Sequence, residues 1–202
     1  MPRISLNPPR TLLLRLVEWY SRRTYGEVLE PLRATAHNMP VLMATARFEQ
    51  RVAKWKALDP GLKHLAEMVT AVRIGCSWCV DFGHWLAEEH GLPMEKIQYV
   101  PEWREHRELF TLTELRVMEF AKAMTETEPA VTDELAEPLV RELGERAFVE
   151  LVAMIAVENQ RSRTNAALGM TGQGFSDRCE VPLRTGAAAR GGTGARDGAA
   201  GR

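Results

Sequence analysis

Hydrophobic residues along this chain follow the spacing of amphipathic helices in almost every segment. They recur three and four positions apart, and no segment between turn signals alternates apolar and polar residues as a half-buried strand does. The pattern therefore predicts an all-α protein, a bundle of about eight helices without a β-sheet.

Glycine, proline and capping residues mark where the helices should begin and end. Asp59 and Pro60 begin one helix, and Thr111 and Glu114 have the spacing of a capping box. We expect helical segments at residues 11–25, 28–38 (punctuated by Pro31 and Pro40), 41–58, 62–74, 76–90, 115–124, 132–143 and 145–168, with an irregular stretch over 99–108.

The composition of the chain argues against several classes of function. The chain has 26 Lys and Arg against 27 Asp and Glu, so its net charge does not favour a nucleic acid partner. The apolar run at residues 12–14 is broken by Arg15, which excludes a secretory core or membrane span there, and we expect a cytoplasmic protein. No glycine-rich turn lies between a strand and a helix, so we expect no tightly bound cofactor.

Two of the three cysteines carry the strongest chemical signal. Cys76 and Cys79 are three residues apart at the expected start of a helix, so they share a face and can cycle between dithiol and disulfide. A first helical turn also favours a thiolate, the reactive form of cysteine. The thiol pair therefore predicts redox chemistry, with at least one acidic thiol.

The same spacing also serves as half of a zinc site, or arises in an inert core. A structural zinc needs two more ligands, and no second pair of this kind exists. Cys179 lies beside the glycine-rich end of the chain. The histidines left to complete such a site are His64, His84, His90 and His106. We therefore expect no metal.

The sequence around the cysteines resembles a known family. Residues 62–68 (Leu-Lys-His-Leu-Ala-Glu-Met) and 75–83 (Gly-Cys-Ser-Trp-Cys-Val-Asp-Phe-Gly) resemble the signature helix pair of the carboxymuconolactone decarboxylase superfamily. Residues 115–124 and 156–169 resemble its redox branch, the alkyl hydroperoxidase D-like proteins, and the similarity covers about 30–175. We therefore expect an N-terminal helical extension at 1–29, a helical domain of this kind at 30–180, and a tail at 181–202.

The tail should be disordered. From residue 185 onward it contains six Gly, six Ala and three Arg and no large apolar side chain. Such a segment cannot offset the entropy lost on ordering.

The resemblance implies a small helical subunit that forms a homo-oligomer, such as a dimer, trimer or hexamer. Cys79 would be the attacking thiol and Cys76 the resolving one, in a hydroperoxide reductase or disulfide reductase. The substrate would be a hydroperoxide or a small disulfide, and a separate thiol donor would return the electrons.

Two departures from the family alter the expected proton relay. Peroxidase members carry a glutamate twelve residues before the first cysteine, where this chain has His64, and a histidine four residues after the second, where it has Gly83. The candidate replacements are His64, Glu67, Asp81 and His84. We favour His64 and Glu67 because they share one side of their helix.

Each candidate also has a structural interpretation. Glu67 can pair with Lys63 at i and i+4, and His64 can be an ordinary half-buried histidine. Asp81 can serve only to complement the helix dipole, and His84 lies partly off the thiol face.

Other residues near the thiols are also open to two interpretations. Trp78 and Phe82 are candidates for an apolar substrate pocket, although Trp78 can equally pack against a neighbouring subunit. The abrupt polarity at 158–165 predicts either an internal hydrogen-bond network near the thiol helix or an intersubunit contact, and we favour a structural role.

Three functions follow from these observations. The leading one is a thiol-dependent antioxidant enzyme. The alternatives are a decarboxylase-like enzyme acting on a small carboxylated lactone, which has no need of two cysteines, and a non-catalytic oligomeric module whose cysteines are inert.

Overall fold

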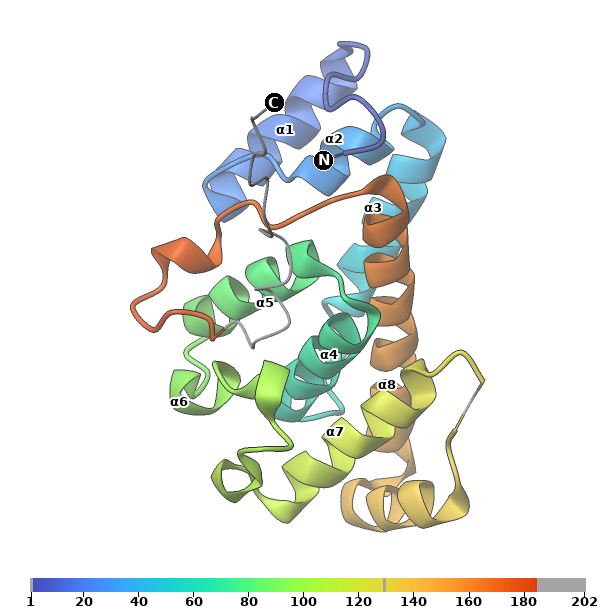
Figure 1. Cartoon of the computed structure of the whole chain (residues 1–202). Helices are drawn as coiled ribbons and strands as arrows, with labels where there is room; N and C mark the ends of the chain where they lie inside the picture. Colours follow the sequence, from blue (N-terminus) through green and yellow to red (C-terminus); the bar gives the residue numbers. More distant parts are fainter. Residues whose placement is uncertain (1, 129, 185–202) are drawn as a thin grey trace, which may run out of the picture.

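The computed structural model describes residues 2–128 and 130–184 (Figure 1). These residues form eight α-helices and no strand, which confirms the all-α prediction. The helices are α1 (Leu12–Tyr25), α2 (Glu30–Thr35), α3 (Met39–Val52), α4 (Pro60–Ile74), α5 (Ser77–Glu89), α6 (Met94–Ile97), α7 (Leu112–Thr125) and α8 (Asp133–Leu168). Short 3-10 turns lie at Val100–Glu102, Arg107–Leu109 and Ser176–Arg178.

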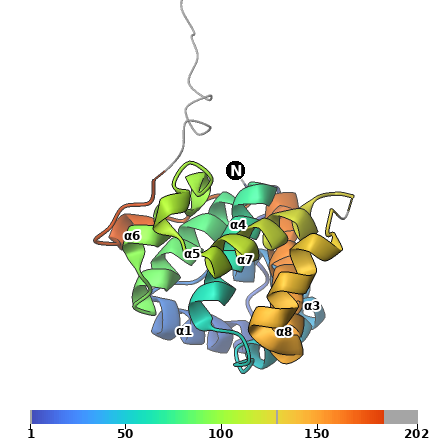
Figure 2. The ribbon, with the colours of Figure 1, turned by 90° about the horizontal axis from the view of Figure 1, so that it is seen from below.

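The hydrophobic core lies where α4, α7 and α8 pack against one another. Leu65 and Val69 of α4 contact the core from one side, and Val117, Phe120 and Leu151 fill it from the other two helices. Seen from below, α4, α5 and α7 lie side by side between α6 and the long α8 (Figure 2). Helix α5 lies on the outer side of α4, and the N-terminus of α5 contacts α8.

Helix α4 is buried on more than one face, as its central position requires. Asp59 caps it by accepting the backbone N–H groups of Gly61 and Leu62. It ends at Gly75, whose φ of 80° lies in the left-handed region that glycine adopts without strain. The chain turns at Gly75 from α4 into α5, and this turn places the thiol pair beside the end of α4.

Helix α3 is shorter than the sequence predicts. It ends at Val52 rather than 58, because the segment after it is held by side chains of other helices. The carbonyl of Trp55 accepts a hydrogen bond from Lys63, and the backbone N–H of Ala57 donates one to Glu150. These tertiary contacts replace the helical hydrogen bonds that periodicity alone would continue. The short helix α6 was likewise not among the expected elements.

Helix α8 is interrupted at Gly144, where the sequence predicts one helix to end and another to begin. The backbone there has φ 76° and ψ 157°, which no helix adopts. Only glycine takes this conformation without strain, so the predicted break is confirmed although the two halves follow one another directly.

The N-terminal segment packs onto the rest of the chain. Leu14 of α1 lies in a small apolar cluster with Ala36 and Leu42, and Arg3 donates hydrogen bonds to the carbonyls of Ala166 and Ala167 at the end of α8. Helices α1, α2 and α3 gather at one end of the molecule (Figure 1).

Residues 181–184 belong to the described part of the predicted tail, and Val181 packs against the core. Residues 185–202, where the sequence predicts disorder, lie outside the described residues.

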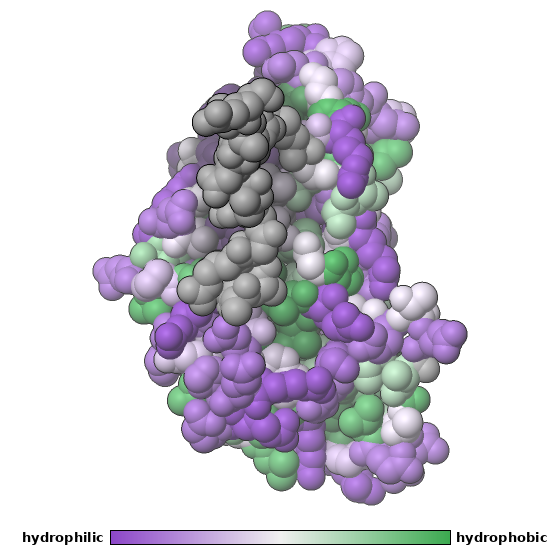
Figure 3. Space-filling model, in the orientation of Figure 1, coloured by the Kyte–Doolittle hydropathy of each residue, from purple (hydrophilic) through white to green (hydrophobic). Residues whose placement is uncertain are grey.

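In the space-filling view the upper end of the molecule is mainly hydrophilic, with hydrophobic groups gathered near the middle of this face (Figure 3).

Across the described helices, none combines the length and apolar character needed to cross a bilayer.

Candidate active site at the thiol pair

Cys76 and Cys79 are joined as a disulfide at the start of α5, with their Cα atoms 5.3 Å apart. The sequence predicts both on the first helical turn, but Cys76 is the N-cap residue just before it. In that position its sulfur accepts the backbone N–H of Cys79 at 3.3 Å. The positive end of α5 therefore faces the sulfur of Cys76, where it stabilises a thiolate.

Both cysteines are buried within the described chain. Cys76 is 1% exposed and Cys79 is 8% exposed. The cluster around them contains Ala34, Leu6 and Leu29 from the N-terminal part of the chain and Met170 from the segment after α8. A small reactant therefore meets Cys79 before Cys76, and a larger one requires movement of the covering side chains.

The third cysteine does not share this environment. Cys179 is free and half-buried, and burial raises the pKa of its thiol to about 12, with Glu88 adding to the rise. It therefore stays protonated at neutral pH. Among residues 2–128 and 130–184, no three His, Cys, Asp or Glu side chains gather in a way that would hold a metal ion.

A row of polar side chains on α8 leads to the thiol pair. Glu158, Ser162 and Asn165 are spaced at i, i+4 and i+7, so they share one face of the helix, and each is at most 6% exposed. The Ser162 hydroxyl donates to Glu158 at 2.6 Å. The amide nitrogen of Asn165 lies 3.4 Å from the sulfur of Cys79.

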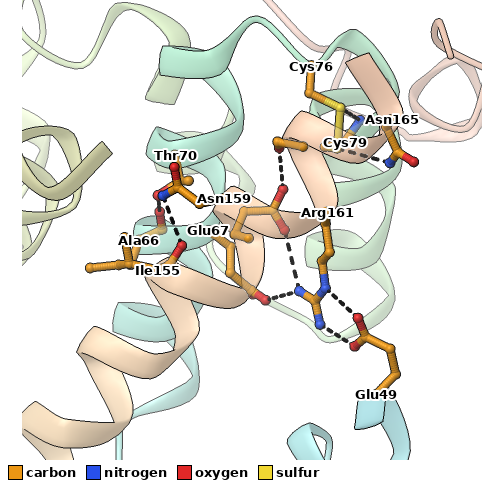
Figure 4. Close-up of polar contacts among 12 residues, drawn as sticks. Glu49, Ala66, Glu67, Thr70, Cys76, Cys79, Ile155, Asn159, Arg161 and Asn165 are labelled. Carbon is orange, nitrogen blue, oxygen red and sulfur yellow. Dashed lines mark hydrogen bonds and ion pairs between the residues drawn. A yellow bond between two sulfur atoms is a disulfide. The ribbon is translucent and has the colours of Figure 1, made fainter. Parts of the chain in front are cut away.

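Arg161 joins three helices through carboxylates beside this row (Figure 4). Its guanidinium forms a two-bond contact with Glu49 of α3 and a hydrogen bond of 2.8 Å with Glu67 of α4. It also lies 3.4 Å from Glu158. The cluster therefore contains three carboxylates and one guanidinium.

Glu67 pairs with a different residue from Lys63, the partner that the sequence suggests. Lys63 does not bond Glu67 but forms an ion pair with Glu150 at 2.5 Å. Glu67 turns instead to Arg161. Burial raises the pKa of Glu67, and Arg161 opposes this rise.

Glu158 is the most deeply buried carboxylate of the cluster. Burial raises its pKa to about 7, with Glu67 adding to the rise and Arg161 opposing it. Its protonation state therefore changes near neutral pH.

His64 is buried on α4, and its Nε2 has no hydrogen-bond partner among the described residues. Burial lowers the pKa of His64 to about 4, with His90 and His84 acting in the same direction and the backbone of Gly83 opposing them. The ring is therefore uncharged at neutral pH. A Cβ added at Gly83 would lie 2.5 Å from the Met68 sulfur, so a histidine fits there only if Met68 shifts.

Asp81 is occupied by the segment that follows α8. Its carboxylate accepts the backbone N–H groups of Gln173, Gly174, Phe175 and Ser176 and the Ser176 hydroxyl. Burial alone would raise the pKa of Asp81, but these hydrogen bonds outweigh it and lower the pKa. Both oxygens of Asp81 are occupied by this loop, so the geometry makes Asp81 an anchor for residues 173–176.

His84 is also engaged away from the thiols. It is completely buried, and its Nε2 lies 2.7 Å from the carbonyl oxygen of Val181. This contact fixes the segment after the last 3-10 turn.

Trp78 and Phe82 stack on each other, with ring centroids 4.9 Å apart. Tyr25 and Phe175 pack edge-on against Phe82, and the Trp78 indole N–H donates to Gln173. Other side chains of the chain therefore fill the space beside these rings. The cluster fixes α5 against α1 and the loop after α8.

Asn165, which contacts Cys79, was not among the predicted site residues, and neither were Glu158, Arg161 and Ser162 on the same stretch of α8. The signal for them was the change from apolar to polar residues along α8, which the sequence leaves open between an internal network and a subunit contact. The structure shows the internal network, and its end at Cys79 depends on how α5 and α8 cross.

The sequence is similar to one protein family and to a protein of Escherichia coli. Residues 40–126 match the model of the carboxymuconolactone decarboxylase family. The chain is 31% identical over 183 residues to the uncharacterized protein YnjA of Escherichia coli (strain K12), a match that covers 90% of this chain and 97% of YnjA.

Two solved structures share the fold. The debrominase Bmp8 superimposes with a TM-score of 0.73 at 19% identity, covering 84% of this chain and 92% of Bmp8. An uncharacterized peroxidase-related protein from Silicibacter sp. TM1040 gives 0.72 at 16% identity, covering 84% of this chain and 89% of that protein. At these identities the likeness extends to the fold alone.

Proposed function

The chain belongs to the carboxymuconolactone decarboxylase family, and we propose that it is a thiol-dependent oxidoreductase that reduces hydroperoxides or small disulfides. The observation that carries this proposal is the pair Cys76 and Cys79, which lies within disulfide distance at a helix start. Hydrogen bonds from the Cys79 backbone and from Asn165 reach the two sulfurs and favour their charged forms.

In the proposed cycle Cys79 attacks first. It is the more exposed of the two, and the Asn165 amide donates to its sulfur. The thiolate attacks one oxygen of a hydroperoxide, the O–O bond breaks, and the other oxygen leaves with a proton as an alcohol. Cys79 becomes a sulfenic acid.

Cys76 then resolves the sulfenic acid. Its sulfur forms the disulfide, and the hydroxyl of the sulfenic acid leaves with the Cys76 proton as water. A dithiol donor restores the pair by attacking Cys79. Cys76 is the leaving group in that step, and the start of α5 stabilises its thiolate, which speeds departure.

We also propose that the chain works as a homo-oligomer. Helix α1 exposes large apolar side chains on the face opposite Leu14, with Leu12 83%, Leu16 59% and Trp19 58% exposed. A contiguous apolar surface of this kind is typical of a subunit contact.

The alternative functions have less support. A lactone-processing reaction requires acid and base groups but no second cysteine. A non-catalytic module would leave the polar row to Cys79 without a purpose.

The experiment that tests the proposal is the consumption of cumene hydroperoxide by reduced protein supplied with dithiothreitol. Cys79→Ser should abolish turnover, whereas Cys179→Ser should leave it intact. Unchanged turnover in Cys79→Ser would reject the proposed function.

A further inference from the structure

Three buried polar side chains, Glu158, Ser162 and Asn165, lie along one face of α8 between the Arg161 cluster and the thiol pair. Glu158 is 5% exposed, Ser162 is completely buried, and Asn165 is 6% exposed. Buried polar side chains reduce stability unless they are paired, so three of them on one helix face require an explanation. One end of this row is the sulfur of Cys79, and the other is the Arg161 cluster (Figure 4).

The charges of that cluster do not cancel. Arg161 faces Glu49 from α3, Glu67 from α4 and Glu158 on its own helix. One guanidinium carries a single positive charge against three carboxylates, of which Glu49 and Glu67 are partly exposed, so the cluster favours the uptake of a proton by one of them.

Other titratable groups near the cluster do not remove this imbalance. Lys63 of α4 is paired with Glu150, and His64 of the same helix is uncharged at neutral pH because burial lowers its pKa to about 4. On α1, burial raises the pKa of Tyr25, with Tyr20 and Glu49 adding to the rise and Arg161 opposing it, so this phenol also carries no charge.

Glu158 is the carboxylate best placed to take up that proton. Its side chain is 7% exposed, against 22% for Glu67 and 35% for Glu49. Its contact with Arg161 is 3.4 Å, longer than those of the other two, while the Ser162 hydroxyl bonds it at 2.6 Å. Glu158 therefore has the weakest pairing to the cation, and it is the carboxylate that lies on the same face of α8 as Asn165.

We propose that Glu158 exchanges a proton with the thiol pair during catalysis, taking up the proton of Cys79 and returning it to the leaving group. The Ser162 hydroxyl bonds Glu158 on the face of α8 that carries Asn165. The inference rests on the proposed thiol function and assigns its proton carrier. Glu158 lies on α8 and is not one of the four proton-relay candidates that the sequence suggests.

The protons balance through one cycle. The Cys79 thiol loses its proton to the Glu158 carboxylate, giving a thiolate and a neutral acid. The thiolate attacks the hydroperoxide, and the acid returns the proton to the departing alkoxide, which leaves as alcohol. The later formation of water uses the Cys76 proton, so Glu158 is again a carboxylate at the end.

Cys79 reactivity with iodoacetamide tests this role without any peroxide. The measurement uses the full chain carrying Cys76→Ser and Cys179→Ser, so that only Cys79 reacts, between pH 5 and 9. With Glu158 present, the rate should rise in two steps, one of them near pH 7. Glu158→Gln should remove that step and leave a single inflection. Superimposable profiles would overturn the proposal.

Glu150→Gln is the matched control, because Glu150 is a buried carboxylate on the same helix whose partner is Lys63. It should retain both inflections. In the enzyme with both thiols, Glu158→Gln should lower hydroperoxide turnover at least 100-fold, the scale of a lost general acid. Absence of turnover in the unmodified protein would count against the proposed function only, since the alkylation profiles still test Glu158.

A second measurement covers the case in which Glu158→Gln fails to fold. Carbon-13 NMR of the glutamate carboxyl groups in otherwise native reduced protein should reveal one carboxyl titrating near pH 7. That titration should shift in Cys79→Ser, because its coupled partner is gone. An identical titration in both proteins would overturn the proposal.

Discussion

The side-chain amide nitrogen of Asn165 lies 3.4 Å from the sulfur of Cys79, across the contact between α8 and α5. This relationship joins the thiol helix to the polar face of the longest helix. It gives Cys79 a fixed hydrogen-bond donor in a buried site, where such a donor has a large effect on the charged form.

Asn165→Ala should make Cys79 less acidic. A hydrogen bond to a charged group contributes roughly 1.5–3 kcal/mol, so the pKa of Cys79 should rise by about one to two units. The ultraviolet absorbance of the thiolate, followed against pH in protein with Cys76→Ser and Cys179→Ser, measures this shift. Asn159→Ala is the control, because that amide bonds Thr125 and its own helix and should leave the pKa unchanged.

Glu158 should also make stability depend on pH. Because burial raises its pKa from 4.5 to about 7, the folded state keeps a proton that the unfolded chain releases. The free energy of unfolding should therefore fall as pH rises from about 4.5 to 7, by roughly 3 kcal/mol at most. Urea denaturation at several pH values should show that this slope is lost in Glu158→Gln. A slope of equal size in both proteins would contradict the raised pKa.

Asp81→Asn should affect the loop after α8 and leave the thiols unchanged. The variant loses the charge that holds four backbone N–H groups, which should cost about 1–3 kcal/mol of unfolding free energy. The pKa of Asp81 is lowered in the fold, so its contribution should be present above about pH 3.9 and lost as pH falls further. Faster amide exchange at residues 173–176 would report the released loop. A changed pKa of Cys79 would show that Asp81 takes part in the redox site.

The sequence predicted most of the fold because helical periodicity and capping residues are local signals. The capping box of Thr111 and Glu114 is present as predicted, and Gly144 breaks α8 at the expected position. The end of α3 was wrong by several residues, since Lys63 and Glu150 are remote in sequence from the segment they hold.

The candidate site was predictable only in part for the same reason. The spacing of Cys76 and Cys79 is a local signal, and their proximity followed from it. The surroundings of Glu67 and Asp81 depend on which helices meet, because Arg161 and the 173–176 loop approach them from distant parts of the chain. No spacing within one helix contains that information.

Leu16→Glu should weaken self-association. A charge in the middle of the exposed apolar face of α1 would have to be buried in a subunit contact, where it has no partner. Sedimentation equilibrium should show a smaller assembly than for the unchanged protein. Leu112→Glu is the control, because Leu112 is similarly exposed, at 61%, but lies on α7. Equal masses for the unchanged protein and Leu16→Glu would reject α1 as the contact.

The mass of the peptides that contain the two cysteines shows whether a hydroperoxide oxidises Cys76 and Cys79 to a disulfide. Reduced protein with Cys179→Ser is treated with one equivalent of cumene hydroperoxide, then alkylated and digested without reductant. Cys76 and Cys79 should resist alkylation and together lose two hydrogens, and one equivalent of cumyl alcohol should be released. Two alkylated, unlinked cysteines with the hydroperoxide unconsumed would contradict it.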